Sequence, residues 1–101
     1  HKGVPSKVKK LAEVYTEDMH FLTWESNKLS PSPESANYFV VYRFRKGEKV
    51  NINNAANIVN ITGDNFYVIP YESGRAEYTY VVTAVDSFHN ESKPVKLKVK
   101  N

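Results

Sequence analysis

Period-two alternation of apolar side chains is the feature of this sequence that most restricts its fold. In the segment YTYVVTAV, residues 78–85, every second side chain, beginning with Tyr78, points to one side of an extended chain. No apolar stripe with helical spacing runs over a useful length of the sequence. The pattern therefore predicts short antiparallel strands rather than helices.

Turn residues separate these runs and set the number of strands. The expected strands are 8–15, 20–26, 37–48 with its turn at Gly47, 49–52, 66–69, 78–86 and 94–100, with a brief further pairing at 58–61. Residues 27–37 are predicted to form a loop because two prolines and three serines interrupt any ladder. Residues 53–58, NNAANI, predict a single helical turn. About seven strands favour an all-β sandwich of two antiparallel sheets.

The core is expected to consist of the large residues on the inward face of each strand. These residues are Leu22, Trp24, Val40, Tyr42, Tyr80, Val82, Ala84 and Leu97. The opposite face of the third and sixth runs carries Phe39, Val41, Val81 and Val85. These four predict a continuous apolar patch outside the sandwich and a candidate interface. β-branched residues also suit strands for their own sake, so both interpretations stay open.

The length and composition fit one domain. The chain has 101 residues, of which 41% are hydrophobic and 13% aromatic, and disordered segments lack aromatics. Residues 1–6 are expected to be a linker or the cut end of a longer chain, and residues 7–101 the domain. No apolar run approaches the roughly 20 residues that cross a bilayer, so we expect no membrane contact by this domain itself.

The loop after the sixth run, DSFHNES, is the segment that most resembles a catalytic loop. It places His89 near Asp86, Glu91 and Ser92. One tight loop does not create a cleft or an oxyanion hole, whereas turn chemistry explains each of these residues. We therefore expect no catalytic residues, and Asn90 is the residue expected to tolerate a positive φ.

Metal and cofactor sites are not expected either. A zinc site needs three or four convergent ligands, and the chain has no cysteine and only His1, His20 and His89 as histidines. Its four glycines are isolated, so no phosphate-binding loop is present.

Basic residues raise the question of nucleic-acid binding, since the net charge is +3. The lysines gather in the first and last runs, where they alternate with apolar residues. Lysines on edge strands discourage aggregation through those edges, and no recognition element accompanies them. We expect no nucleic-acid partner.

Three segments carry a resemblance to a known family. LTWE at 22–25, YFVVYRF at 38–44 and YTYVVTAVD at 78–86 resemble the fibronectin type III pattern. The resemblance implies that Trp24 packs beneath Tyr42 and Tyr80, and that Tyr78 caps a corner through a hydroxyl-to-backbone bond. The preceding VIPYESGRAEY keeps a proline and a glycine but departs from the family's spacing.

A narrower resemblance concerns YFVVYRFRKGE and YVVTAVDSFHNESKP. Together they resemble the C-terminal fibronectin type III module of bacterial glycoside-hydrolase-like lipoproteins. This resemblance implies a non-catalytic accessory module that packs against, spaces or orients a preceding glycan-active domain of the same polypeptide. It also implies an extracytoplasmic location: secreted, periplasmic or at the cell surface.

Direct binding is the alternative function. Flat aromatic rings at strand ends and loops suit the faces of sugars, and the candidates for glycan contact are Tyr15, Tyr67, Tyr71 and Phe88. A polysaccharide is therefore a possible partner, and core or surface packing of these rings is the competing interpretation. A protein partner on the apolar outer face is the other form of this alternative.

Overall fold

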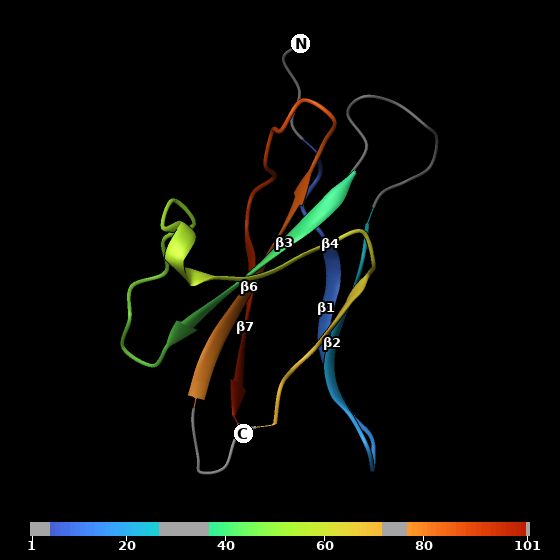
Figure 1. Ribbon diagram of the computed structural model, residues 1–101, viewed down its shortest axis with the longest axis vertical. Coiled ribbons are helices and arrows are strands. Elements are labelled where there is room, and N and C mark those ends of the chain that lie inside the picture. The colour runs from blue at the N-terminus through green and yellow to red at the C-terminus, as the bar shows by residue number, and fades with distance from the viewer. Residues whose placement is uncertain (1–4, 27–36, 72–76, 101) are drawn as a thin grey trace.

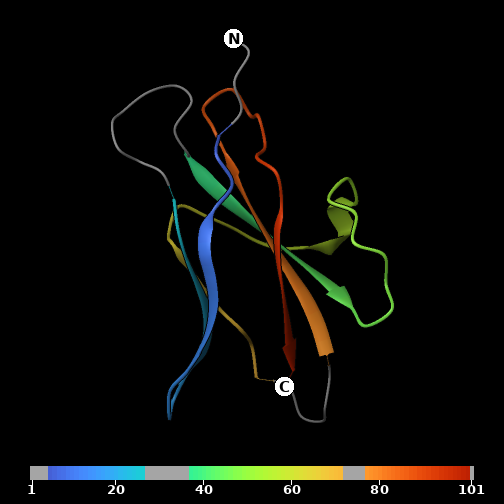
Figure 2. The same ribbon diagram turned by 180° about the vertical axis from the view of Figure 1, so that it is seen from behind.

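The computed structural model describes residues 5–26, 37–71 and 77–100, which form a two-layer β-sandwich (Figures 1 and 2). Its strands are β1 (Lys9–Tyr15), β2 (His20–Glu25), β3 (Tyr38–Arg45), β4 (Ile58–Thr62), β5 (Phe66–Val68), β6 (Glu77–Val85) and β7 (Val95–Lys100). One sheet has the order β1-β2-β5 and the other β4-β3-β6-β7, and every pairing is antiparallel. The predicted all-β sandwich of about seven strands is confirmed.

The connection between β3 and β4 differs from the prediction. Residues 49–52, expected as a short strand, are not a strand, because asparagine turn chemistry dominates there. The Asn51 side chain accepts a hydrogen bond from the backbone N of Asn53 at 3.0 Å. The predicted helical turn is present as η1 (Ala55–Asn57), a single 3₁₀ turn whose N-cap Asn54 accepts from the N of Ala56.

The inner core lies between the two sheets. Its buried members are Val8, Leu22, Trp24, Phe39, Val41, Tyr67, Ile69, Tyr78, Tyr80, Val82, Ala84 and Val99, and the partly buried Leu97 packs against them. The Trp24 and Phe39 rings meet edge to face with centroids 5.6 Å apart, a geometry that aromatic pairs favour. This contact joins β2 of one sheet to β3 of the other.

An outer core covers the other face of the four-stranded sheet. It contains Val40, Tyr42, Phe44, Val81 and Val85, with Tyr38, Val50, Ile52 and Ile58 packed over them. The prediction that Val40 and Tyr42 belong between the sheets is therefore wrong. Val41 pairs with Val82, and directly opposed residues share a face, so the odd-numbered residues of β3 join the even-numbered residues of β6.

The same register divides the predicted interface patch. Phe39 and Val41 lie in the inner core, whereas Val81 and Val85 lie in the outer core. All four are buried, with exposures of 0%, 0%, 0% and 4% in that order. The prediction of one continuous exposed patch is wrong, because the β3–β4 loop folds over the face that was expected to be open.

Both edges of the sandwich next to the chain ends carry lysine, as expected. β1 and β7 are edge strands, and the outer face of β7 presents Lys96, Lys98 and Lys100. β1 also contains an irregularity in register between Lys9 and Ala12, where Lys10 has a φ of 55°. Lysines and bulges both discourage pairing with a further strand.

Replacing Phe39 tests its place in the inner core. Phe39→Ala should lower the free energy of unfolding by about 3–5 kcal/mol, since it empties a fully buried aromatic site. Urea unfolding followed by Trp24 fluorescence measures this loss, with Phe39→Leu as a milder variant. The half-exposed Phe88→Ala serves as the control and should change stability by about 0.5 kcal/mol or less. Equal effects of Phe39→Ala and Phe88→Ala would place Phe39 outside the core.

Candidate functional site

Asp86 organises the loop after β6. Its Oδ1 accepts hydrogen bonds from the backbone N of Phe88 and of Asn90, each at 2.9 Å, and its Oδ2 accepts from Asn90 Nδ2 at 3.2 Å. Burial acts to raise the pKa of Asp86, but the bonds from Asn90 and Phe88 outweigh it and lower that pKa below its ordinary value. The carboxylate is thus committed to closing a turn.

Ser92 and Glu91 are committed in the same way. Ser92 Oγ accepts from the backbone N of Ala84 at 2.9 Å and donates to the carbonyl of Lys93 at 3.0 Å. Glu91 Oε2 accepts from the hydroxyls of Tyr42 and Thr83, each at 2.5 Å. Burial, followed by the bond to Glu91, raises the pKa of the Tyr42 phenol above its usual value. This anchor across three segments was not foreseen, because it depends on the outward direction of Tyr42.

His89 lies on the exposed side of this loop. The left-handed backbone position was expected at Asn90. The structure places it at His89, which has a φ of 65°. Its Nδ1 lies 3.4 Å from the Tyr38 hydroxyl. Within this loop, His89 is not arranged as a base between a nucleophilic hydroxyl and a carboxylate that orients it. In the described part of the chain, no three His, Cys, Asp or Glu side chains converge as a metal site would require.

The other end of the sandwich contains a hollow of about 510 Å³, which we call the hairpin hollow. It lies between the β1–β2 turn and the segment after β5, at the lower end of Figure 1. Its lining residues are Tyr15, Thr16, Glu17, Asp18, Met19, His20, Val68, Ile69, Pro70 and Tyr71. Two of the four predicted glycan-contact residues, Tyr15 and Tyr71, thus meet at one site, with exposures of 61% and 93%.

The other two predicted glycan-contact residues lie elsewhere. Tyr67 is buried, opposite Leu22, and its ring centroid is 6.0 Å from that of Tyr80. The prediction that Tyr67 lies outside the core is wrong, because β5 places it on the inward face. Phe88 is 53% exposed but lies in the β6–β7 loop, at the opposite end of the sandwich from the hairpin hollow (Figures 1 and 2).

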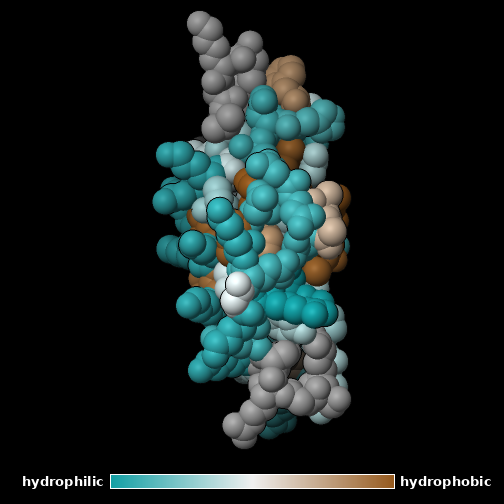
Figure 3. Space-filling view, turned by 90° about the vertical axis from the view of Figure 1, so that its left-hand side faces the viewer, coloured by the Kyte–Doolittle hydropathy of each residue, from teal (hydrophilic) through white to brown (hydrophobic). Residues whose placement is uncertain are grey.

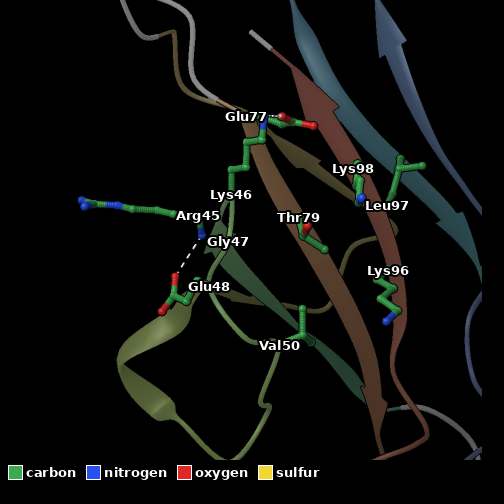
Figure 4. A pocket seen from close by; sticks show the side chains of 10 residues that line it. All are labelled: Arg45, Lys46, Gly47, Glu48, Val50, Glu77, Thr79, Lys96, Leu97 and Lys98. Carbon is green, nitrogen blue, oxygen red and sulfur yellow. Dashed lines mark hydrogen bonds and ion pairs between the residues drawn. The ribbon is translucent and has the colours of Figure 1, made fainter.

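A second hollow, of about 460 Å³, lies on the outer side of β6 and β7 (Figure 4). Lys96 and Lys98 flank it beside Thr79, and Leu97 points to the other side of β7. Lys46 Nζ lies 3.4 Å from Glu77 Oε2, so part of the positive charge is paired. This side of the molecule is mostly hydrophilic, with smaller apolar patches between the hydrophilic side chains (Figure 3). No aromatic ring is among the described residues that line the hollow, and these residues offer no stacking surface like that of single-strand nucleic-acid sites.

The three-stranded sheet exposes apolar side chains that the sequence analysis missed. Val14 lies opposite Phe21, and Phe21 lies opposite Val68, on the face turned away from the inner core. Phe66 is on the same face, and Phe66 and Val68 are 46% and 42% exposed. We call these four residues the outer apolar face. Successive residues of a strand point to opposite faces, so an inward Leu22 implies an outward Phe21. This alternation is the signal that could have identified the outer apolar face.

Comparison with solved structures supplies a close match in shape. A structure described as "Structure of FN3tt mut" aligns with 95% of this chain and 94% of its own length, with a TM-score of 0.66 and 19% sequence identity. The chain has the fold of a fibronectin type III domain. No family model matches the sequence, and no curated protein matches it.

The fibronectin type III fold explains the placement of the sequence motifs. Trp24 is buried on β2, and Tyr80, Val82 and Ala84 face it from β6, while Tyr42 lies on the other side of its sheet. Tyr78 stands near the start of β6 beneath Arg43, whose guanidinium carbon is 4.4 Å from the ring centroid. The corner expected before Tyr78 falls on residues 72–76, outside the described residues.

The part of the chain that the structure describes contains no helix with the length and apolar character needed to span a bilayer.

Acid titration tests the role of Asp86. Its folded-state pKa lies below the ordinary value of 3.8, so its contribution to stability is present above pH 3.8 and disappears as the pH falls through the folded-state pKa. Asp86→Asn should therefore be less stable than the parent at neutral pH, and its stability should fall less on acidification below pH 3.8. Urea unfolding across that range measures both effects. Asp64→Asn, in the exposed β4–β5 turn, is the matched control and should retain the parental acid dependence.

Proposed function

We propose that this fibronectin type III-like domain is a non-catalytic accessory module of an extracytoplasmic, glycan-active polypeptide. It packs against the preceding domain of that polypeptide and orients it. The narrower sequence resemblance supports the biological setting. The commitment of Asp86, Glu91 and Ser92 to hydrogen bonds within the fold supports a non-catalytic role.

The observation that carries the packing role is the outer apolar face. Phe66 and Val68 sit on β5, an edge strand, beside the half-buried Phe21 and Val14. Contiguous exposed apolar side chains on a sheet are a common feature of interfaces. The interface that the sequence predicted on β3 and β6 is buried, so we assign the interface to the outer apolar face instead. The proposed partner is still the preceding domain of the polypeptide.

Carbohydrate binding is the second candidate function. The meeting of Tyr15 and Tyr71 in the hairpin hollow favours it, since two exposed rings can contact the faces of a sugar chain. This site lies at one end of the sandwich and adjoins the outer apolar face at Val68, which belongs to both.

Substitutions on the outer apolar face test the packing role. The double variant Phe66→Thr, Val68→Thr retains strand propensity and should leave the isolated domain folded. It should weaken binding to the separately produced preceding domain by about tenfold or more, as for a central interface residue. Titration calorimetry measures this change. Ile61→Thr is the matched control, because Ile61 is 59% exposed on a strand of the other sheet. Equal weakening by Ile61→Thr, or no weakening by the double variant, would contradict the proposal.

Retardation in polysaccharide-containing gels tests the second candidate. Tyr71→Ala should reduce the retardation by galactomannan or hydroxyethyl cellulose, because it removes a nearly fully exposed ring without emptying the core. Phe88→Ala, which removes an exposed ring at the other end of the sandwich, should leave retardation unchanged. Equal retardation of the parent and Tyr71→Ala would argue against glycan contact at Tyr71.

A further inference from the structure

We infer that Tyr15 is a pre-positioned stacking platform that selects neutral sugars in the hairpin hollow. The inference deepens the second candidate function and rests on it. Three features of the described residues carry it: the way the Tyr15 ring is held, its exposure, and the charge of the residues around it.

The Tyr15 ring is fixed at two points. One face stacks on His20, with ring centroids 3.8 Å apart and planes inclined by 10°. The Tyr15 hydroxyl donates to the backbone carbonyl of Lys100 at 3.2 Å, which ties the end of β1 to the last strand. These contacts define both the position and the tilt of the ring.

His20 is itself held in place. Its Nε2 lies 2.6 Å from Glu13 Oε2, and both side chains are largely buried, with 14% and 26% exposure. Glu13, Tyr15 and His20 lie on the inward face of the β1–β2 hairpin, because Glu13 pairs with the inward Leu22. A carboxylate therefore orients the imidazole, and the imidazole supports the tyrosine.

Tyr15 nevertheless remains 61% exposed. A side chain that must be ordered when a ligand binds reduces the affinity, and one that is ordered beforehand avoids this cost. An exposed aromatic ring held by a stack and a hydrogen bond is thus suited to bind a flat apolar surface. The ring face of a hexose is such a surface, and Tyr71, 93% exposed in the same hollow, supplies a second ring.

The charge of the hairpin hollow restricts the sugar. Glu17 and Asp18 line it, and among the described residues that line it there is no lysine or arginine. Carboxylates accept hydrogen bonds from sugar hydroxyls and repel carboxylate or sulfate groups. The chain as a whole has a net charge of +3, so the global charge favours anionic polymers and the hollow disfavours them. The preference for neutral over acidic glycans therefore distinguishes binding in the hollow from nonspecific attraction.

Titration calorimetry of the intact chain with galactomannan, hydroxyethyl cellulose and polygalacturonate tests the inference. We expect binding of at least one neutral polymer that tolerates added salt, and weaker binding of polygalacturonate. Tyr15→Ala should weaken binding of the neutral polymer by about tenfold or more, as expected for an aromatic anchor. Tyr15→Phe keeps the ring and its stack while losing the bond to Lys100, so it should weaken binding less than Tyr15→Ala.

The variant His20→Ala tests whether the fixed position of the Tyr15 ring matters for binding, in addition to the contact that the ring makes with the sugar. It leaves the Tyr15 ring present but removes its support, so we expect binding between that of the parent and that of Tyr15→Ala. Phe88→Ala should bind as the parent does, and thermal melts establish that each variant is folded.

Three results would overturn the inference: no binding of either neutral polymer, equal binding by Tyr15→Ala and the parent, or polygalacturonate binding as tight as neutral binding. Loss of binding in Tyr71→Ala alone would leave glycan binding standing and remove the role of Tyr15. None of these results bears on docking through the outer apolar face. The single variant Phe66→Thr tests that docking separately, because Val68 lines the hairpin hollow as well as the outer apolar face.

Discussion

Phe39 packs edge to face with Trp24 because β3 pairs with β6 in a register that sets Val41 opposite Val82. This register decides which half of β3 lies between the sheets. It sends the other half, including Tyr42, to the outside, where the β3–β4 loop must cover it. It also delivers the Tyr42 hydroxyl to Glu91, which anchors the loop after β6. The inner core, the outer core and the β6–β7 loop therefore depend on one strand pairing.

Much of this architecture follows from the sequence alone. The alternation in β2 and β6, the single 3₁₀ turn at Asn54, and the turn closed by Asp86 depend on neighbours in the chain, and local chemistry predicts them. The faces of β3 do not follow in this way. Residues 39–42 are apolar on both sides because both sides are buried, so alternation does not show which side faces the other sheet. Only the register with β6 resolves it, and register is a long-range property.

The candidate sites show the same division. Tyr15 and Tyr71 were identifiable as aromatic residues near strand ends, but their meeting in one hollow depends on the β1–β2 turn lying beside the segment after β5. Tyr67 was misplaced because a strand of three residues gives too little alternation to define its face. The outer apolar face was overlooked for a related reason. Phe66 and Val68 matter only together with Phe21 and Val14, which belong to different strands.

The hydrogen bond from Tyr15 to the carbonyl of Lys100 has a mechanical consequence. β1 and β7 lie in contact and run in the same direction, so the start of β1 and the end of β7 are at opposite ends of the sandwich (Figure 2). Tension applied across those two points would load the two strands in shear along their length rather than peel them apart. Resistance would then come from many contacts sharing the load at once. A domain joined to its neighbours through these strands would transmit force as a stiff element.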